Sequence, residues 1–227
     1  LGYVCTEWST LDEHGNTVSR EPFYEKSGVV PADEEARLNI IGSHTIPSAM
    51  LINKERLLAV GGYNEQFHWA MDLDLKLKLN LRHDTGYIKD LLCNYREHSG
   101  QSVAAGAKTK LLLMELYRTK SDILDNLPAA KAHLAAHRGK MHSNMAKSAV
   151  DYGFICLDAG DSDLALEYLH LAKSFDLNVD ANPRFRKLWS KVGRPVLVER
   201  TEKVNLAGTG LPVWPYELPP GSLEIEL

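Results

Sequence analysis

Cysteine is scarce in this sequence, and long apolar runs are missing. Its 227 residues include three cysteines, Cys5, Cys93 and Cys156, which lie far apart and lack the spacing of metal ligands. An odd number of scattered thiols argues against a disulfide framework, so we expect buried, reduced thiols and a cytoplasmic location. No apolar run reaches the roughly 20 residues that a transmembrane helix needs, so we expect no transmembrane segment.

An excess of positive charge is also missing. The chain has 26 lysines and arginines against 30 aspartates and glutamates, a formal net charge of -4. Nucleic-acid binding usually relies on a clustered basic face, so we expect no nucleic-acid partner. The hydrophobic fraction of 44% and the charged fraction of 25% are ordinary for a globular protein with a core.

The most informative stretch is residues 61–74, which read Gly-Gly-Tyr-Asn-Glu-Gln-Phe-His-Trp-Ala-Met-Asp-Leu-Asp. The glycine pair permits a tight turn, and the aromatic-rich loop after it leads to two carboxylates at the start of a leucine-rich segment. Upstream, residues 46–52 predict a buried strand and residues 53–60 a short helix that ends at the glycines. Such a loop is typical of an active site.

The segment 71–82 gives two conflicting signals. Apolar and polar residues alternate strictly, which by periodicity alone indicates a strand. Leucine and lysine favour helices, however, and Asp72 with Lys76 and Asp74 with Lys78 form favourable i,i+4 pairs. We therefore predict a helix. Side chains at i and i+2 on a helix diverge by about 200°, so the two aspartates do not share a cation, and we expect Asp74 to face solvent.

The rest of the chain predicts an α/β region followed by helices. Residues 1–18 indicate a hairpin, 21–37 a surface loop or short helix, and 86–96 a strand with its turn. Gly160 and Asp161 mark the end of one helix and the N-cap of the next, so that residues 149–175 resemble one tetratricopeptide-like hairpin. Helices are further expected over 110–127, 129–157 and 182–192, and a Pro/Gly-rich extended tail over 194–227.

In this order, the motifs resemble the C-terminal half of the catalytic domain in inverting GT-A glycosyltransferases of the family 2 type. That family has a strand and helix, a Gly-Gly-aromatic-Asp-Glu turn, a Glu-Asp pair that opens a helix, and a Tyr-Arg-x-His segment. Here the corresponding residues are 61–65, with Asn64 where the family often has aspartate, Met71 with Asp72, and 95–98. The resemblance covers roughly residues 1–103, followed by a helical extension over 104–193.

The resemblance implies transfer of a sugar from a nucleotide-sugar donor to an acceptor hydroxyl, with a divalent cation, Mn²⁺ or Mg²⁺. It makes Asp72 the candidate general base, although Met71 replaces the family's glutamate. His68 and Trp69 would form an acceptor platform, since aromatic rings stack on sugar faces. The remaining candidates are a loop near the acceptor or the diphosphate at Gly42, Ser43 and His44, a phosphate contact at Arg96, and a metal or diphosphate ligand at His98.

Each candidate also has a purely structural interpretation. Asp72 is equally suited to a helix-capping carboxylate paired with Lys76, and Trp69 to a core residue. Gly42 and His44 fit an ordinary turn, and residues 95–98 fit a polar loop after an edge strand.

The family's Asp-x-Asp metal motif and its nucleotide-binding half would lie before Leu1. We therefore expect the cation to be held mainly by residues outside this chain, and the chain alone to lack transferase activity. The competing class is a non-catalytic interaction module, in which the helical hairpin region recruits a protein partner. One tetratricopeptide-like hairpin cannot bury both of its faces, so we expect it to pack on the α/β region or on that partner.

Overall fold

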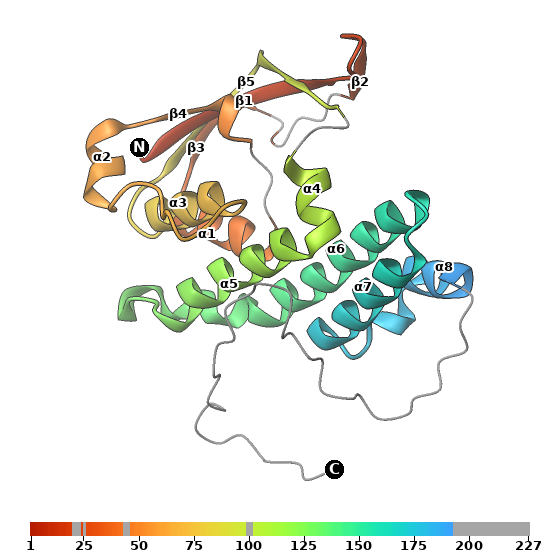
Figure 1. Cartoon of the computed structure of the whole chain (residues 1–227). Helices are drawn as coiled ribbons and strands as arrows, with labels where there is room; N and C mark the ends of the chain where they lie inside the picture. The colour runs from red at the N-terminus through yellow and green to blue at the C-terminus, as the bar shows by residue number, and fades with distance from the viewer. Residues whose placement is uncertain (20–23, 25, 43–45, 99–101, 193–227) are drawn as a thin grey trace. The chain divides into compact units, whose positions relative to one another are not determined.

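The computed structural model describes residues 1–19, 24, 26–42, 46–98 and 102–192 (Figure 1). Within them, one mixed sheet contains β1 (Tyr3–Leu11), β2 (Thr17–Ser19), β3 (Gly28–Val30), β4 (Met50–Ile52) and β5 (Thr85–Arg96). The order is β2-β1-β5-β3, with β4 also paired to β1. Strands β1 and β5 run parallel and the other pairs are antiparallel. The predicted hairpin is confirmed as β1 and β2.

The segment before the glycine pair differs from its prediction. Instead of a buried strand over 46–52, Pro47–Ala49 forms a 3-10 turn, and only β4 is extended. Proline suits the first position of such a turn, and β4 lies on one edge of the sheet, where Leu51 is 78% exposed. The short helix is confirmed as α2 (Lys54–Ala59), whose N-cap Asn53 accepts a hydrogen bond from the Arg56 backbone.

Helix α3 (Met71–Asn80) confirms the helical prediction for the alternating segment. Its leucines divide between two apolar clusters: Leu75 and Leu79 pack with the sheet, whereas Leu73 and Leu77 join the helical core. Figure 1 shows α3 between the sheet and the longer helices. Opposite faces of a helix are two residues apart in sequence, so a helix buried on two sides produces the alternation of a strand.

Helix α1 (Ala32–Ile41) and strand β3 lie where a surface loop or short helix was expected. The short-helix alternative is confirmed by α1, but the surface position is wrong for Glu35, which is fully buried together with Asn39 just beyond the predicted range. The Tyr3 and Tyr24 hydroxyls donate to Glu35 at 3.1 and 2.8 Å, and Asn39 Nδ2 donates to Asn80 Oδ1 at 3.1 Å. These bonds join α1 to β1 and α3 and satisfy most of the buried polar atoms there, although Asn39 Oδ1 accepts no hydrogen bond.

The helical region comprises α4 (Ser102–Thr109), α5 (Leu111–Asp125), α6 (Arg138–Asp158), α7 (Ser162–Phe175) and α8 (Pro183–Val192), with 3-10 turns at Ala129–His137 and Val179–Ala181. Asp161 caps α7 by accepting a hydrogen bond from the Leu164 backbone, as predicted. The hairpin of α6 and α7 shares one core with residues of α1 and α3, so the helices pack on the α/β region. The tail expected over 194–227 lies outside the described residues.

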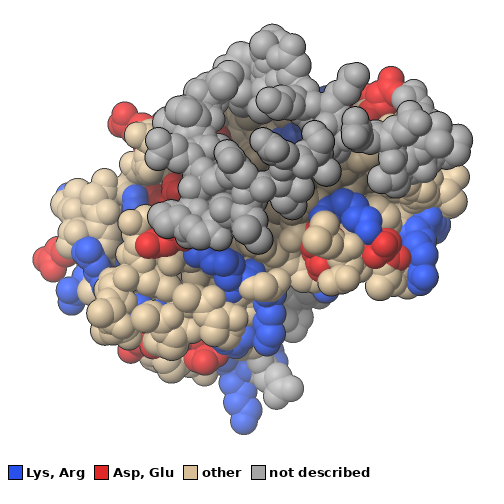
Figure 2. Space-filling model, turned by 90° about the horizontal axis from the view of Figure 1, so that it is seen from below, with Lys and Arg blue, Asp and Glu red and all other residues tan. Residues whose placement is uncertain are grey.

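Charged side chains of both signs are interspersed on the face seen in Figure 2. Among the described residues, ion pairs join Arg138 to Asp125, Lys173 to Asp180, and Arg184 to Asp151. None of the described helices is long and apolar enough to cross a bilayer. All three cysteines are free, as expected, with Cys5 and Cys156 buried.

Candidate active site

Asp72 lies in the first turn of α3, and its side chain is 25% exposed. Its Oδ2 atom is 3.8 Å from the Nζ atom of Lys76, whose side chain is 1% exposed. Burial lowers the pKa of Lys76, whereas the negative charges of Asp72 and Glu35 raise it. The predicted i,i+4 pair is therefore present, and it joins a solvent-accessible carboxylate to a buried lysine.

Asp74 is not solvent-facing, which corrects the prediction for this residue. It is 5% exposed because α5 packs against α3, and its Oδ2 atom lies 2.6 Å from Lys78 Nζ. The two aspartates thus pair with different lysines.

His68 and Trp69 lie next to each other immediately before α3. Their ring centroids are 4.6 Å apart at an interplanar angle of 82°. His68 is exposed, whereas Trp69 is half-buried against α4, where a Cβ on Gly106 would lie 3.1 Å from Trp69 Nε1. Trp69 therefore has part of the character of a core residue while its neighbour faces solvent.

Glu115 of α5 is a residue of this site that the sequence analysis missed. Its Oε2 atom accepts hydrogen bonds from three successive backbone amides, those of His68 at 2.9 Å, Trp69 at 2.7 Å and Ala70 at 3.1 Å. Nothing local in the sequence links Glu115 to this loop, because the two are separated by 45 residues or more. The contact depends on how α5 packs across the start of α3.

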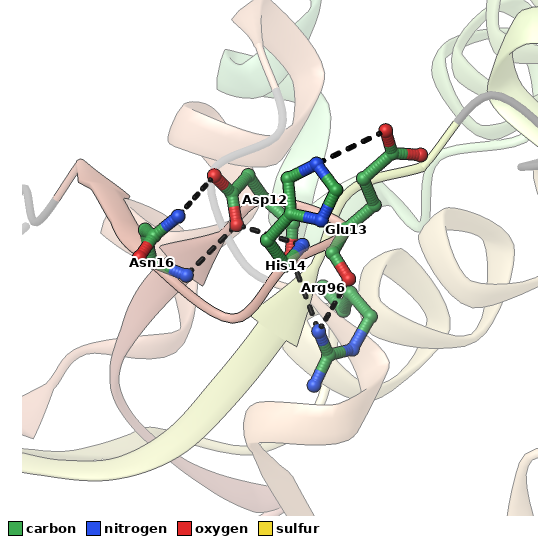
Figure 3. A network of polar contacts seen from close by, with 5 residues as sticks. All are labelled: Asp12, Glu13, His14, Asn16 and Arg96. Atoms are coloured by element: carbon green, nitrogen blue, oxygen red, sulfur yellow. Dashed lines mark hydrogen bonds and ion pairs between the residues drawn. The ribbon is translucent and has the colours of Figure 1, made fainter.

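Arg96 belongs to the far end of the sheet. Its Nη1 atom donates to the backbone oxygens of Asp12 and Glu13, both at 3.2 Å (Figure 3). In the same turn, Asp12 Oδ1 accepts from the backbone amides of His14 and Asn16. Hydrogen bonds lower the pKa of Asp12, and the bond from the Asn16 side chain has the largest effect. Arg96 thus ties the end of β5 to the β1–β2 turn.

Arg96 and His98 form a group separate from Asp72. Leu75, one helical turn after Asp72, packs with Tyr87 near the start of β5. Arg96 follows Tyr87 by nine residues, on the order of 30 Å along an extended strand. The end of the sheet at the β1–β2 turn extends away from α3 in Figure 1. The structure therefore brings together His68, Trp69 and Asp72, but not Arg96 and the exposed His98.

Gly42 ends α1, and its amide donates to Leu38 O at 2.8 Å. The Asn144 side chain of α6 donates to the neighbouring Ile41 O at 2.9 Å, which fixes this end of the helix. Ser43 and His44 lie outside the described residues. Gly42 alone therefore represents the predicted loop in the structure.

A metal site is not formed by the residues that the structure describes. None of their histidines, cysteines, aspartates and glutamates gather in a group of three that could hold an ion. The expected divalent cation, held mainly by residues outside this chain, stays a prediction.

Comparison with known proteins does not identify a family for this chain. No family model, no curated protein and no solved structure matches the chain. The functional proposal therefore rests on one group of residues: His68, Trp69, Asp72, Lys76 and Glu115.

Proposed function

We propose that this chain is the C-terminal part of a GT-A-like, inverting glycosyltransferase domain followed by a helical extension, and that Asp72 is its general base. The observation that carries the proposal is the position of Asp72. It is a partly exposed carboxylate in the first turn of α3, paired with a buried lysine and directly preceded by the His68–Trp69 ring pair. This combination suits proton abstraction beside a sugar-binding surface.

The chemistry assigns a distinct task to each residue. Asp72 takes the proton of the acceptor hydroxyl as its oxygen forms a bond to the anomeric carbon of the donor sugar. The bond from that carbon to the nucleoside diphosphate breaks, and the diphosphate leaves with the bonding electrons. Lys76 Nζ lies 3.8 Å from Oδ2 of Asp72, an ion-pair distance longer than a hydrogen bond, so the carboxylate remains available to accept the proton. The rings of His68 and Trp69 contact the acceptor.

Donor binding is proposed to depend mainly on residues outside this chain, with a Mn²⁺ or Mg²⁺ ion that would offset charge on the leaving diphosphate. Arg96 was predicted to contact the phosphate of the donor. Its guanidinium instead donates to two carbonyl oxygens of the β1–β2 turn, which favours a structural role for this residue. His98, exposed two residues further along, remains the predicted metal or diphosphate ligand.

An interaction module is less well supported, for a specific reason. The apolar faces of α6 and α7 are buried inside this chain, with Ala149, Tyr168 and Leu169 fully covered. A hairpin that recruited a partner through those faces would have to leave its own core.

A transfer assay tests the proposal. The full-length protein is incubated with Mn²⁺, with UDP-glucose, UDP-galactose, UDP-N-acetylglucosamine or GDP-mannose as donor, and with p-nitrophenyl glycosides as acceptors. The anomeric configuration of any product is determined by proton NMR. We expect transfer with inversion from one of these donors. Transfer with retention, or no transfer and no donor hydrolysis across the panel, would count against the proposal.

A further inference from the structure

We propose that Glu115 is a positioning residue of this site: its carboxylate holds the loop of residues 66–70, so that helix α5 determines where Trp69 and Asp72 point. The inference rests on the proposed function and extends it. It assigns a residue of the helical region to the active site, although the glycosyltransferase resemblance covers only residues 1–103.

The hydrogen bonds at Glu115 are of an unusual kind. Three successive backbone amides, from His68 to Ala70, converge on one carboxylate oxygen. Successive N–H groups that point to one side form a concave anion-binding surface, and hydrogen bonds to a charged acceptor are stronger than neutral ones. A carboxylate from a distant helix therefore fixes the backbone direction of this loop.

Glu115 also places a carboxylate at the start of α3, where it accepts from the amide of the N-cap residue Ala70. Ala70 itself has no side chain that could accept a hydrogen bond, and no side-chain cap is formed there. A negative charge next to the N-terminus of a helix interacts favourably with the helix dipole. The beginning of α3, and with it the first-turn residue Asp72, thus depends on a residue of α5.

A second contact from the same face of α5 holds the front of the loop. Arg118, one turn after Glu115, places its guanidinium 5.4 Å from the centroid of the Phe67 ring. Its Nη2 atom also donates to Gln66 Oε1 at 3.4 Å. Residues at i and i+3 share a helix face, so Glu115 and Arg118 engage consecutive parts of the loop together.

The test compares three variants of the full-length protein with the wild type. Glu115→Ala removes the acceptor, and Glu115→Gln keeps an oxygen at the same position without the charge. Glu55→Ala is the matched control, because Glu55 is an exposed glutamate of α2 outside the motif residues 61–65, 71–72 and 95–98. Hydrogen exchange at the amides of residues 68–70 reports on the loop, and acceptor KM, donor KM and kcat are measured with the donor and p-nitrophenyl glycoside found active in the transfer assay.

We expect Glu115→Ala to accelerate exchange at these three amides by at least about tenfold, because it removes their common acceptor. Acceptor KM should rise about tenfold while donor KM stays unchanged, since acceptor residues lie on the loop. Glu115→Gln should bring both the exchange rates and acceptor KM most of the way back to the wild-type values, and Glu55→Ala should change neither.

Two results would overturn the inference. If Glu115→Ala accelerates exchange but leaves the kinetic constants unchanged, Glu115 has only a structural role and the proposed function is unaffected. If exchange at residues 68–70 is also unchanged, the contact itself is refuted. Failure of the proposed function is recognised separately: either the wild type transfers no sugar, or Asp72→Asn leaves turnover intact, whereas the exchange measurement at residues 68–70 needs no turnover.

Discussion

The Lys76 ammonium lies 3.8 Å from Asp72 Oδ2, although the lysine side chain is almost completely buried. The negative charge of Glu35, a buried residue of α1, also raises the pKa of Lys76. Asp72 is therefore linked through Lys76 to the interior of the α/β region. This link distinguishes it from an ordinary helix-capping carboxylate, whose lysine partner would be solvated.

Lys76→Met should impair both stability and turnover. We expect the free energy of unfolding to fall by roughly 3 kcal/mol, because Glu35 remains buried without its compensating charge. We expect kcat to fall about tenfold, because the Asp72 carboxylate loses the group that orients it. Urea denaturation and the transfer assay measure the two effects.

The double variant Lys76→Met/Glu35→Gln separates these effects. Removing the second charge should recover most of the stability, whereas kcat should stay low. A Lys76→Met protein with wild-type kcat would show that the lysine does not orient Asp72.

Lys120 should make stability depend on pH. This residue of α5 is 3% exposed, and burial, with a smaller contribution from the charge of Lys76, lowers its pKa from 10.5 to about 8. Below pH 8 the folded protein carries a buried ammonium, and this cost disappears as pH rises from 8 to 10.5, because the unfolded chain then binds more protons than the folded one.

Lys120→Met should therefore stabilise the protein at pH 7, by up to about 3 kcal/mol at ~1.4 kcal/mol per pKa unit. The difference from wild type should shrink as pH rises from 8 to 10.5, as measured by urea denaturation at each pH. Lys140→Met, at an exposed position of α6, should show no such trend. A Lys120→Met difference that stays constant over this range would contradict the assigned pKa.

Two glycines of α6 should respond in opposite directions to alanine. A Cβ on Gly153 would lie 2.5 Å from Leu188 Cδ2 and 3.3 Å from Tyr168 Cβ, whereas a Cβ on Gly139 would meet no atom within 4 Å. Gly153→Ala should lower the free energy of unfolding by about 1–3 kcal/mol through overpacking. Gly139→Ala should raise it by up to about 1 kcal/mol through helix propensity. Equal shifts in urea denaturation would disprove the close approach at Gly153.

Local signals in the sequence predicted the elements around the site well. The charge pairs of α3, the glycines after α2 and the Asp161 N-cap all depend on neighbours within four residues, and the structure confirms each of them. The alternating leucines were ambiguous because periodicity reports which faces are buried. It does not report what buries them.

The missed features all depend on distant partners. Glu35 looked like a surface residue because the tyrosine that satisfies its Oε1 atom, Tyr3, lies 32 residues away. Asp74 was expected in solvent because nothing in its own segment reveals that α5 covers it. The role of Glu115 could not be predicted from the sequence for the same reason. Its hydrogen-bond donors are backbone amides, which every residue except proline has.

The most direct test of the account is Asp72→Asn in the full-length protein, because asparagine keeps the shape of the side chain but cannot take a proton. We predict that kcat falls by about 10²- to 10⁴-fold while urea denaturation stays cooperative. Asp90→Asn, at an exposed position of β5, should leave kcat unchanged. An Asp72→Asn protein that folds and transfers sugar at the wild-type rate would contradict the assignment of Asp72 as the base.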